Sequence, residues 1–258
     1  MTTIELNSLD FALALALIGA AIALSLWQRL GLVSEIVLAT VRATLQLLAV
    51  GLILDAVFAV NQPWLVLGIV GMMVAIATSA TRHRIAKKRW RLMPIVGGAL
   101  LASVVLTLSY ALLVIVQPPV WYDPQYLIPL VGIVLGNAMN AATIAGERLV
   151  STLRRSTLEI QTHLSLGAMP SQAIAGYRRE AMRAGLLPLL NRMMVVGLVT
   201  LPEMFTGQVL GGNNPLNATS YQLLILFMVA FAEGVAVIIV TQGIARQAFN
   251  RQSQLVER

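Results

Sequence analysis

Residues 221–244, YQLLILFMVAFAEGVAVIIVTQGI, decide the fold class of this protein. The stretch is apolar over most of its length and carries one charged side chain, Glu233. A helix needs about 20 predominantly apolar residues to cross the hydrocarbon core of a bilayer. The stretch therefore predicts a membrane-spanning helix with a carboxylate near its middle.

The whole chain has the composition of a membrane protein. Its 258 residues are 58% hydrophobic and 11% charged, whereas about 25% of the residues in soluble domains are charged. This length has room for roughly six to eight spans and no large soluble domain, so we expect no attached ATPase, kinase or DNA-binding module. Because the chain has no cysteine, disulfides, thiol catalysis and thiolate metal sites are excluded.

Six further apolar runs are long enough to span a bilayer. Turn-forming residues separate them, for example Asn61-Gln62-Pro63 and the Gly-Gly-Asn-Asn-Pro sequence at 211–215. The sequence predicts an all-α polytopic integral membrane protein of about seven transmembrane helices, forming a single transmembrane domain over residues 1–258. The six runs are Leu9–Leu26, Ile36–Val60, Trp64–Ala80, Leu92–Val116, Tyr126–Ala145 and Leu186–Leu210.

The basic residues indicate the orientation. When seven helices are threaded back and forth, 16 of the 18 Lys and Arg residues fall on one side, and the other two, Arg42 and Arg192, lie within spans. Cytoplasmic loops carry the excess of Lys and Arg in membrane proteins. We therefore expect the N-terminus outside and the C-terminus in the cytoplasm. The net charge of +7 then belongs to a surface next to the lipid bilayer, and nucleic acid is not an expected partner.

One long segment, at about 147–185, lies on the predicted cytoplasmic side. Its leucine spacing predicts an amphipathic helix that ends at Gly167, and Pro170 suits the start of a second helix over 171–184. This helix-turn-helix is either an interfacial pair held by anionic lipid or a docking element for a cytoplasmic partner. The leucines are Leu153, Leu158, Leu164 and Leu166.

Polar residues within the spans are candidates for a substrate path, because ionisable groups in a bilayer are costly. Glu233 lies too deep to reach the interface, so it belongs either to a structural network or to a cation path. Glu203 follows Pro202, which should kink the sixth helix. We expect Arg42 to snorkel to the inner interface, with a role in the path as the alternative. The path candidates are Glu233, Glu203, Asn137, Asn140, Met139, Arg42 and Gln46.

Two of these candidates, Glu233 and Glu203, could ligate a metal transiently, with amide oxygens as weak additional ligands. The two asparagines, Asn137 and Asn140, follow a Gly-x-x-x-Gly pair at 132–136. Such a pair most often marks close packing between helices. We therefore expect the fifth span to pack tightly against a neighbour at this point.

Four stretches together resemble the FetB iron-export permease family of ABC transporters, which includes plant aluminium-tolerance permeases. Their order and spacing fit over about residues 29–242. Glu203 departs from the family pattern, which usually has glycine there, so a role for this carboxylate does not carry over. The four stretches are VRATLQL at 41–47, IPLVGIVLGNAM at 128–139, LSLGA at 164–168 and VGLVTLP at 196–202.

The resemblance implies a homodimeric permease subunit in a bacterial inner membrane that exports iron or another metal cation. A separate cytoplasmic ABC ATPase subunit would dock on residues 152–183. ATP and Mg²⁺ would bind to that partner, because this chain has no Gly-x-x-x-x-Gly-Lys-Ser/Thr motif, and we expect neither a cofactor nor enzyme activity here. The implied coupling residues are Leu164, Leu166, Gly167, Ala168 and Gln172, and the expected hinges are Pro188, Pro202 and Gly207.

Two other functions fit the residues. The first is a secondary cation/proton transporter that uses Glu233 as its proton site. The second is a membrane relay subunit that transmits ATPase motion and transports nothing.

Overall fold

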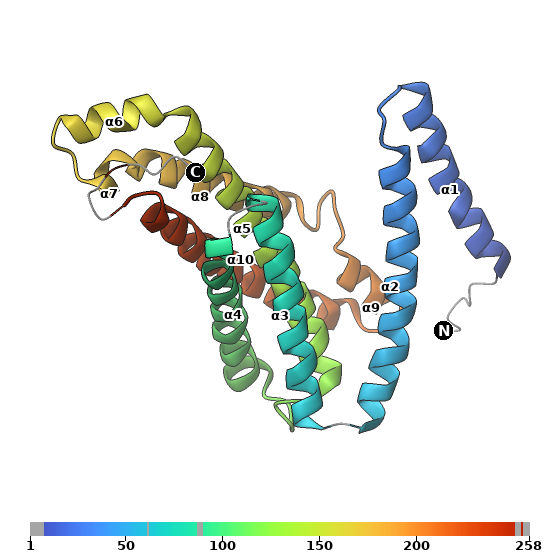
Figure 1. The fold of residues 1–258 in the computed structure, drawn as a ribbon. Coiled ribbons are helices and arrows are strands. Elements are labelled where there is room, and N and C mark those ends of the chain that lie inside the picture. Colours follow the sequence, from blue (N-terminus) through green and yellow to red (C-terminus); the bar gives the residue numbers. More distant parts are fainter. Residues whose placement is uncertain (1–7, 61, 87–89, 251–253, 255–258) are drawn as a thin grey trace. The chain divides into compact units, whose positions relative to one another are not determined.

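A computed structural model of the chain describes residues 8–60, 62–86, 90–250 and 254. These residues form helices and connections, without a β-strand among them (Figure 1). The all-helical prediction is confirmed. The helices are α1 (Ser8–Trp27), α2 (Val33–Val60), α3 (Pro63–Ile85), η1 (Trp90–Leu92), α4 (Met93–Tyr110), the π-helix η2 (Ala111–Val116), α5 (Pro124–Arg155), α6 (Thr157–Ser165), α7 (Pro170–Ala173), α8 (Ala175–Val195), α9 (Glu203–Leu210) and α10 (Pro215–Gln247).

The chain divides into two compact units. The first comprises residues 1–62 with 210–212, and in it α1 and α2 pack against each other. Most described side chains of both helices are exposed, although both helices are strongly apolar. A helix that is apolar on all sides is suited to a lipid environment. The prediction of one transmembrane domain over the whole chain stays a prediction.

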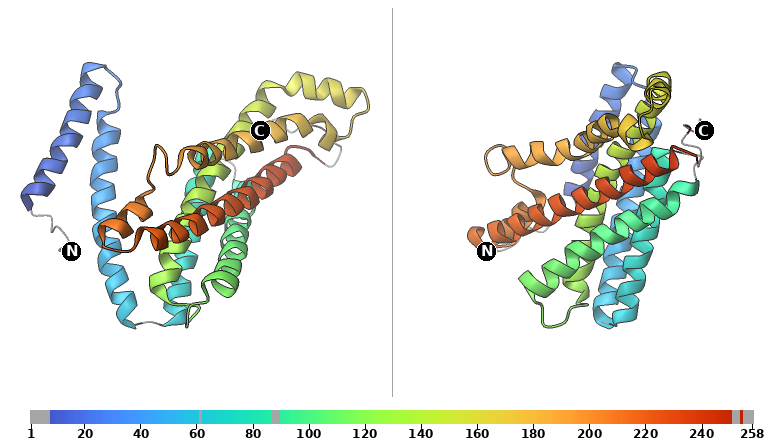
Figure 2. Two further views of the ribbon diagram at one scale, coloured as in Figure 1. Left: turned by 180° about the vertical axis from the view of Figure 1, so that it is seen from behind. Right: turned by 90° about the vertical axis from the view of Figure 1, so that its left-hand side faces the viewer.

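The second unit, residues 63–209 with 213–258, has α5 and α10 at its centre. Helix α10 packs against α5, α4 and α8, and α3 packs against α5 and α4 (Figure 2). Small residues line the contact between the central helices, where Ala141 and Ala145 of α5 meet Val237 of α10. Small side chains let helix backbones approach closely, which is how helices associate within membranes.

Five helical segments among the described residues are long and apolar enough to cross a membrane. They are Val33–Phe58, Pro63–Ile85, Trp90–Val116, Pro124–Arg155 and Pro215–Gln247. The apolar part of α1, Leu13–Trp27, is shorter than a full span. The chain is therefore a multi-pass membrane protein.

The predicted sixth span, Leu186–Leu210, is not one helix. Helix α8 ends at Val195 and α9 begins at Glu203. The break has two local causes. Gly197 adopts a φ of 82°, which helices do not use, and Pro202 lacks an N–H and disfavours helical geometry in the residue before it. A kink was expected, but the helix stops.

The segment 147–185, called the arm below, projects from the second unit as a helical hairpin (Figure 1). The predicted turn at Gly167 is confirmed, since this residue has a φ of 91° between α6 and α7. The helices on either side are longer than expected. Helix α5 runs without a break from Pro124 into the arm as far as Arg155, and α8 runs from Ala175 in the arm to Val195. The arm and the apolar part of the unit therefore share two continuous helices.

A close contact between α5 and α8 occurs at Gly185. A Cβ atom on this residue would lie 2.8 Å from the carbonyl oxygen of Ala141 and 2.9 Å from Cβ of Ala145. We expect Gly185→Ala to push the two helices apart and to reduce stability by about 1–3 kcal/mol, the usual range for overpacking.

Gly176 in the same helix provides a matched control, because a Cβ there would meet no described atom within 4 Å. Gly176→Ala should leave stability unchanged or raise it by up to about 1 kcal/mol, because alanine restricts the unfolded chain. Thermal unfolding of the two purified variants in detergent measures the difference. Equal melting temperatures would contradict the close contact.

Candidate functional site

The break between α8 and α9 borders a cavity of about 640 Å³. Its walls come from α5, from the end of α8, from residues 196–202 with the start of α9, and from α10. All of these segments belong to the second unit. Most of the lining is apolar. The polar lining residues are Asn137, Asn140, Arg192, Thr200, Glu203 and Gln222.

The connection 196–202 is a closed turn. Gly197 donates its N–H to the carbonyl of Thr200 at 2.9 Å, and Val199 donates to the carbonyl of Val195 at 3.0 Å. The turn thus satisfies backbone groups that the interrupted helix leaves free. Its first and last residues, Val196 and Pro202, both line the cavity.

The glycine pair of α5 has a different role from the one expected. Gly132 and Gly136 both line the cavity, and a Cβ on Gly136 would meet no atom of the described residues within 4 Å. Within this chain the pair is therefore not a tight helix contact. Instead, the missing side chain of Gly136 leaves open space along the α5 wall, whereas a Cβ on Gly132 would be in ordinary contact with Cε of Met73 at 3.6 Å.

An ion pair lies next to the cavity. The Nη2 atom of Arg192 on α8 is 3.6 Å from Oε1 of Glu233 on α10. The same nitrogen donates a hydrogen bond of 3.2 Å to Oδ1 of Asn137 on α5, while the amide nitrogen of Asn137 donates to the carbonyl of Ile133 at 2.8 Å. One arginine therefore joins three helices. Arg192 of α8 thus pairs with a carboxylate of another helix.

The two partners of this ion pair differ in burial. The Glu233 side chain is 3% exposed, whereas the Arg192 side chain is 61% exposed and lines the cavity. A buried carboxylate needs a counter-charge or a proton. Arg192 supplies that charge from the cavity side.

Several predicted path residues come together here. Glu203, Asn137 and Asn140 line the cavity directly, and Glu233 is connected to it through Arg192. Met139 is not among the described lining residues. Arg42 and Gln46 lie on α2 in the first unit, so their part in a path stays a prediction.

Sequence reasoning missed Gln222 and Thr200 and left Arg192 out of the path. The Oε1 atom of Gln222 is buried without a hydrogen-bond partner among the described residues. A usable signal existed, because Gln222 lies about three helical turns before Glu233 and so shares its face of the helix. Thr200 carried no such signal, since it lies in a turn that hydropathy does not reveal.

The donors available at the cavity are almost all oxygen atoms. In the described part of the chain, no three or more His, Asp or Glu side chains gather as they do in a resident metal site. Scattered carboxylate and amide oxygens suit a hard cation that binds weakly and leaves again. Metal ligation by Glu233 and Glu203 stays a prediction.

The expected hinge residues lie in different settings. Pro188 lies inside α8, which continues on both sides of it. Pro202 immediately precedes α9, and Gly207 lies within that helix. Their roles as hinges stay predictions.

The arm ends in an exposed apolar tip. Leu158, Leu166 and Met169 are all largely exposed. Around Gly167, the N–H of Ala168 donates to the carbonyl of His163 at 3.0 Å, which closes the end of α6. Of the implied coupling residues, Leu166, Gly167 and Gln172 are exposed, and Leu164 and Ala168 are half-buried.

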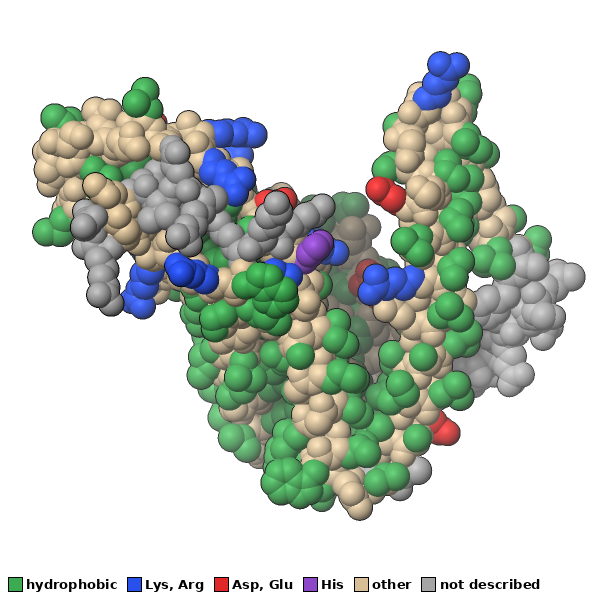
Figure 3. All heavy atoms as spheres, in the orientation of Figure 1, with side chains coloured by type: hydrophobic (Ala, Val, Ile, Leu, Met, Phe, Trp, Pro, Cys, Tyr) green, Lys and Arg blue, Asp and Glu red, His purple; other side chains and the backbone are tan. Residues whose placement is uncertain are grey.

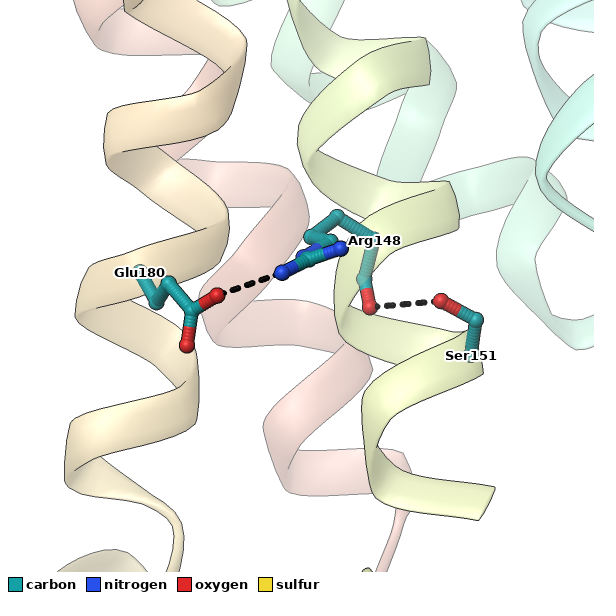
Figure 4. A network of polar contacts seen from close by, with 3 residues as sticks. All are labelled: Arg148, Ser151 and Glu180. Atoms are coloured by element: carbon teal, nitrogen blue, oxygen red, sulfur yellow. Dashed lines mark hydrogen bonds and ion pairs between the residues drawn. The ribbon is translucent and has the colours of Figure 1, made fainter. Parts of the chain in front are cut away.

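Polar contacts join the helices on the two sides of the arm. Glu180 of α8 accepts a hydrogen bond of 2.5 Å from Nη2 of Arg148 of α5, and Ser151 donates to the Arg148 carbonyl at 3.0 Å (Figure 4). Nearer the tip, partial burial raises the pKa of Tyr177, and a hydrogen bond with the Glu159 carboxylate raises it further. This bond links α8 to α6.

The Arg148–Glu180 pair should contribute little to stability. Both side chains are at least half exposed, and exposed ion pairs are worth about 0–1 kcal/mol because water and salt screen them. We expect Arg148→Gln to change the melting temperature in detergent only slightly. A loss as large as that predicted for Gly185→Ala would contradict this expectation.

The charged side chains of the second unit are unevenly distributed. On the face shown in Figure 3, hydrophobic and uncharged side chains cover most of α3 and α4. Lys and Arg side chains gather along the arm and at the end of α3 that carries Arg82 and Arg84. This distribution agrees with an apolar zone within lipid and a basic end outside it.

Comparison with known proteins identifies relatives over almost the whole chain. The model of a family described as "Uncharacterised protein family (UPF0014)" matches residues 8–249. The chain is 50% identical over 253 residues to the UPF0014 membrane protein slr1647 of Synechocystis sp., covering 98% of each chain. No solved structure matches it.

Two more distant relatives have informative names. The chain is 30% identical over 256 residues to the probable iron export permease protein FetB of Escherichia coli, covering 99% of this chain and 97% of that protein. It is 31% identical over 245 residues to Protein ALUMINUM SENSITIVE 3 of Arabidopsis thaliana, covering 95% and 88%. The resemblance noted in the sequence is thereby confirmed.

Proposed function

Because the chain belongs to the UPF0014 family of membrane proteins, we propose that it is the permease subunit of an ABC-type exporter that moves iron, or another metal cation, out of the cytoplasm. A multi-pass membrane permease agrees with its apolar helices and its relatives. The observation that carries the proposal is the cavity at the α8–α9 break, with Glu203 in its wall and Glu233 behind Arg192. Interrupted helices that border a cavity are common cation sites in transporters.

We propose seven membrane crossings, with the N-terminus outside and the C-terminus in the cytoplasm. Five segments have the length and composition of spans. Helix α1 would supply another crossing, and the end of α8 together with α9 would supply the seventh. The support is the charge distribution, because this threading places 16 of the 18 Lys and Arg residues on the cytoplasmic side.

The motor would be a separate ABC ATPase subunit that docks on residues 152–183 and binds ATP and Mg²⁺. The support is that two continuous helices connect the arm with the cavity. Helix α8 is continuous from the arm to Arg192, and α5 is continuous from Asn137 to Arg148 and beyond. Movement of the arm therefore changes the positions of Arg192 and Asn137 at the cavity. A homodimer and a bacterial inner membrane are further parts of the proposal, and both rest on family resemblance.

The test is transport in liposomes that contain the chain and its ATPase subunit, with the arm facing outward. ATP added outside should drive Fe²⁺ into the lumen, and omission of either subunit should stop it. Iron uptake on a pH gradient without nucleotide would favour the secondary transporter. ATP hydrolysis without movement of any metal would favour the relay subunit.

A further inference from the structure

We propose that Arg192 is a resident counter-cation of the cavity. It neutralises Glu233 while no substrate is bound, and it withdraws when a metal cation takes its place beside that carboxylate. The inference rests on the proposed function, since it assumes that a cation enters this cavity. It adds a residue that controls how tightly the cation is held.

The contacts of Arg192 are loose enough for exchange. Its Nη2 atom is 3.6 Å from Oε1 of Glu233, beyond the 2.7–2.9 Å of a charge-assisted hydrogen bond. Its hydrogen bond goes instead to the neutral amide of Asn137, at 3.2 Å. Arginine that binds a carboxylate permanently is commonly bidentate, and this pair is not.

The arm contains a contrasting pair of the same residue types. Arg148 and Glu180 are 2.5 Å apart and hydrogen-bonded. Both are exposed to a similar degree, so neither is a fixed buried charge. At the cavity the carboxylate is buried and the arginine is close but not hydrogen-bonded to it.

The difference in burial indicates which partner moves. Glu233 is 3% exposed and lies in the middle of α10 among buried alanine and valine side chains. Arg192 is 61% exposed and borders open space. Its long flexible side chain can turn into the cavity, whereas the carboxylate cannot leave its place.

Electrostatics makes the exchange mutually exclusive. A bare carboxylate at this depth would be costly, so the empty site needs Arg192. With a metal cation at Glu233, an arginine at the same oxygen would face a like charge a few ångströms away. A cation with two or more charges would displace Arg192 more effectively than a monovalent one, which indicates a multivalent substrate with a preference for oxygen ligands.

The position of Arg192 on α8 couples this exchange to the arm. Because α8 is continuous from Ala175 to Val195, a shift of the arm moves Arg192 relative to Glu233. Return of the guanidinium would expel the bound cation. Arg192 thus acts as a competitor that the motor can advance or withdraw.

The experiment measures equilibrium binding of Mn²⁺, a redox-stable divalent probe, to the purified full-length chain without ATPase or nucleotide. Removing the competitor should tighten binding, so we expect Arg192→Gln to lower the Mn²⁺ dissociation constant about tenfold, equivalent to about 1.4 kcal/mol. Arg192→Lys keeps the charge and should resemble the wild type. Glu233→Gln should abolish the gain when combined with Arg192→Gln.

Arg148→Gln is the matched control, because it removes an arginine from the other ion pair and should leave Mn²⁺ affinity unchanged. If Arg192→Gln does not fold, Arg192→Met, which keeps an apolar stem without the charge, carries the same expectation. Unchanged or weaker Mn²⁺ binding in a folded, charge-free variant would overturn the inference while leaving cation export intact. Absence of binding in the wild type and in every variant would overturn both.

Discussion

Glu233→Gln should abolish metal efflux while leaving the protein folded and inserted in the membrane. The carboxylate is buried beside Arg192, which lines the cavity. Loss of a contact to a charged group in a desolvated site costs up to about 3 kcal/mol, or roughly a hundredfold in rate or affinity. Glutamine has the same size and no charge, and the exposed side chain of Arg192 can turn to water. The measurement is ATP-driven Fe²⁺ uptake by liposomes, with thermal unfolding as the folding check.

Glu35→Gln is the control for this result. It removes a carboxylate of the same type that is exposed in the first turn of α2, outside both the cavity lining and residues 152–183. Efflux by this variant should stay close to that of the wild type. Normal efflux by Glu233→Gln would remove Glu233 from the transport path.

Gly167→Val should uncouple the permease from the proposed ATPase subunit. Gly167 has a φ of 91° at the tip of the arm, a region that β-branched residues almost never adopt. The turn must therefore rearrange, and the exposed residues Leu166 and Met169 on either side of it move with it. We expect ATPase co-purification to fall by about tenfold or more, which corresponds to at least 1.4 kcal/mol of binding energy, and efflux to fall with it.

Gly167→Asn tests the same position with less strain, because asparagine tolerates positive φ better than other non-glycine residues. It should retain most ATPase binding. A Cβ at Gly167 would meet no described atom within 4 Å, so any loss of thermal stability comes from backbone strain, about 1–2 kcal/mol for valine and less for asparagine. Unaltered ATPase binding and efflux in Gly167→Val would show that the arm is not the docking element.

Much of the fold could be predicted because its signals are local. The runs that became α2, α3, α4 with η2, α5 and α10 are long and apolar, and their ends carry proline, asparagine or glycine. The turn at Gly167 followed from a glycine after an amphipathic helix. Each of these features depends on residues within a few turns of one another.

The sixth span shows where such reasoning fails. Residues 196–202, VGLVTLP, are as apolar as a helix interior, so hydropathy does not distinguish their turn from a span. The positive φ of Gly197 and the proline at 202 end the helix. Both residues were visible in the sequence, but only the structure shows that their combined effect is a break and not a kink.

The candidate site was predicted in part. Glu233, Glu203, Asn137 and Asn140 were chosen one by one, because polar groups in spans need a reason. Three features depend on how α5, α8 and α10 are rotated against one another. They are the grouping of these residues at one cavity, the inclusion of Gln222, and the positions of Gly132 and Gly136 in the cavity wall. Helix rotation is set by packing between distant segments.

The sequence by itself determined that this protein is an all-helical membrane chain, which family it resembles and which of its polar residues are out of place in lipid. These properties follow from composition and from spacing along single helices. Only the tertiary structure decided that Arg192 faces Glu233 across α8 and α10, that Asn137 joins them, and that α8 connects this group to the arm. The physical reason is that an ion pair depends on distances between helices, which neither hydropathy nor helical periodicity contains.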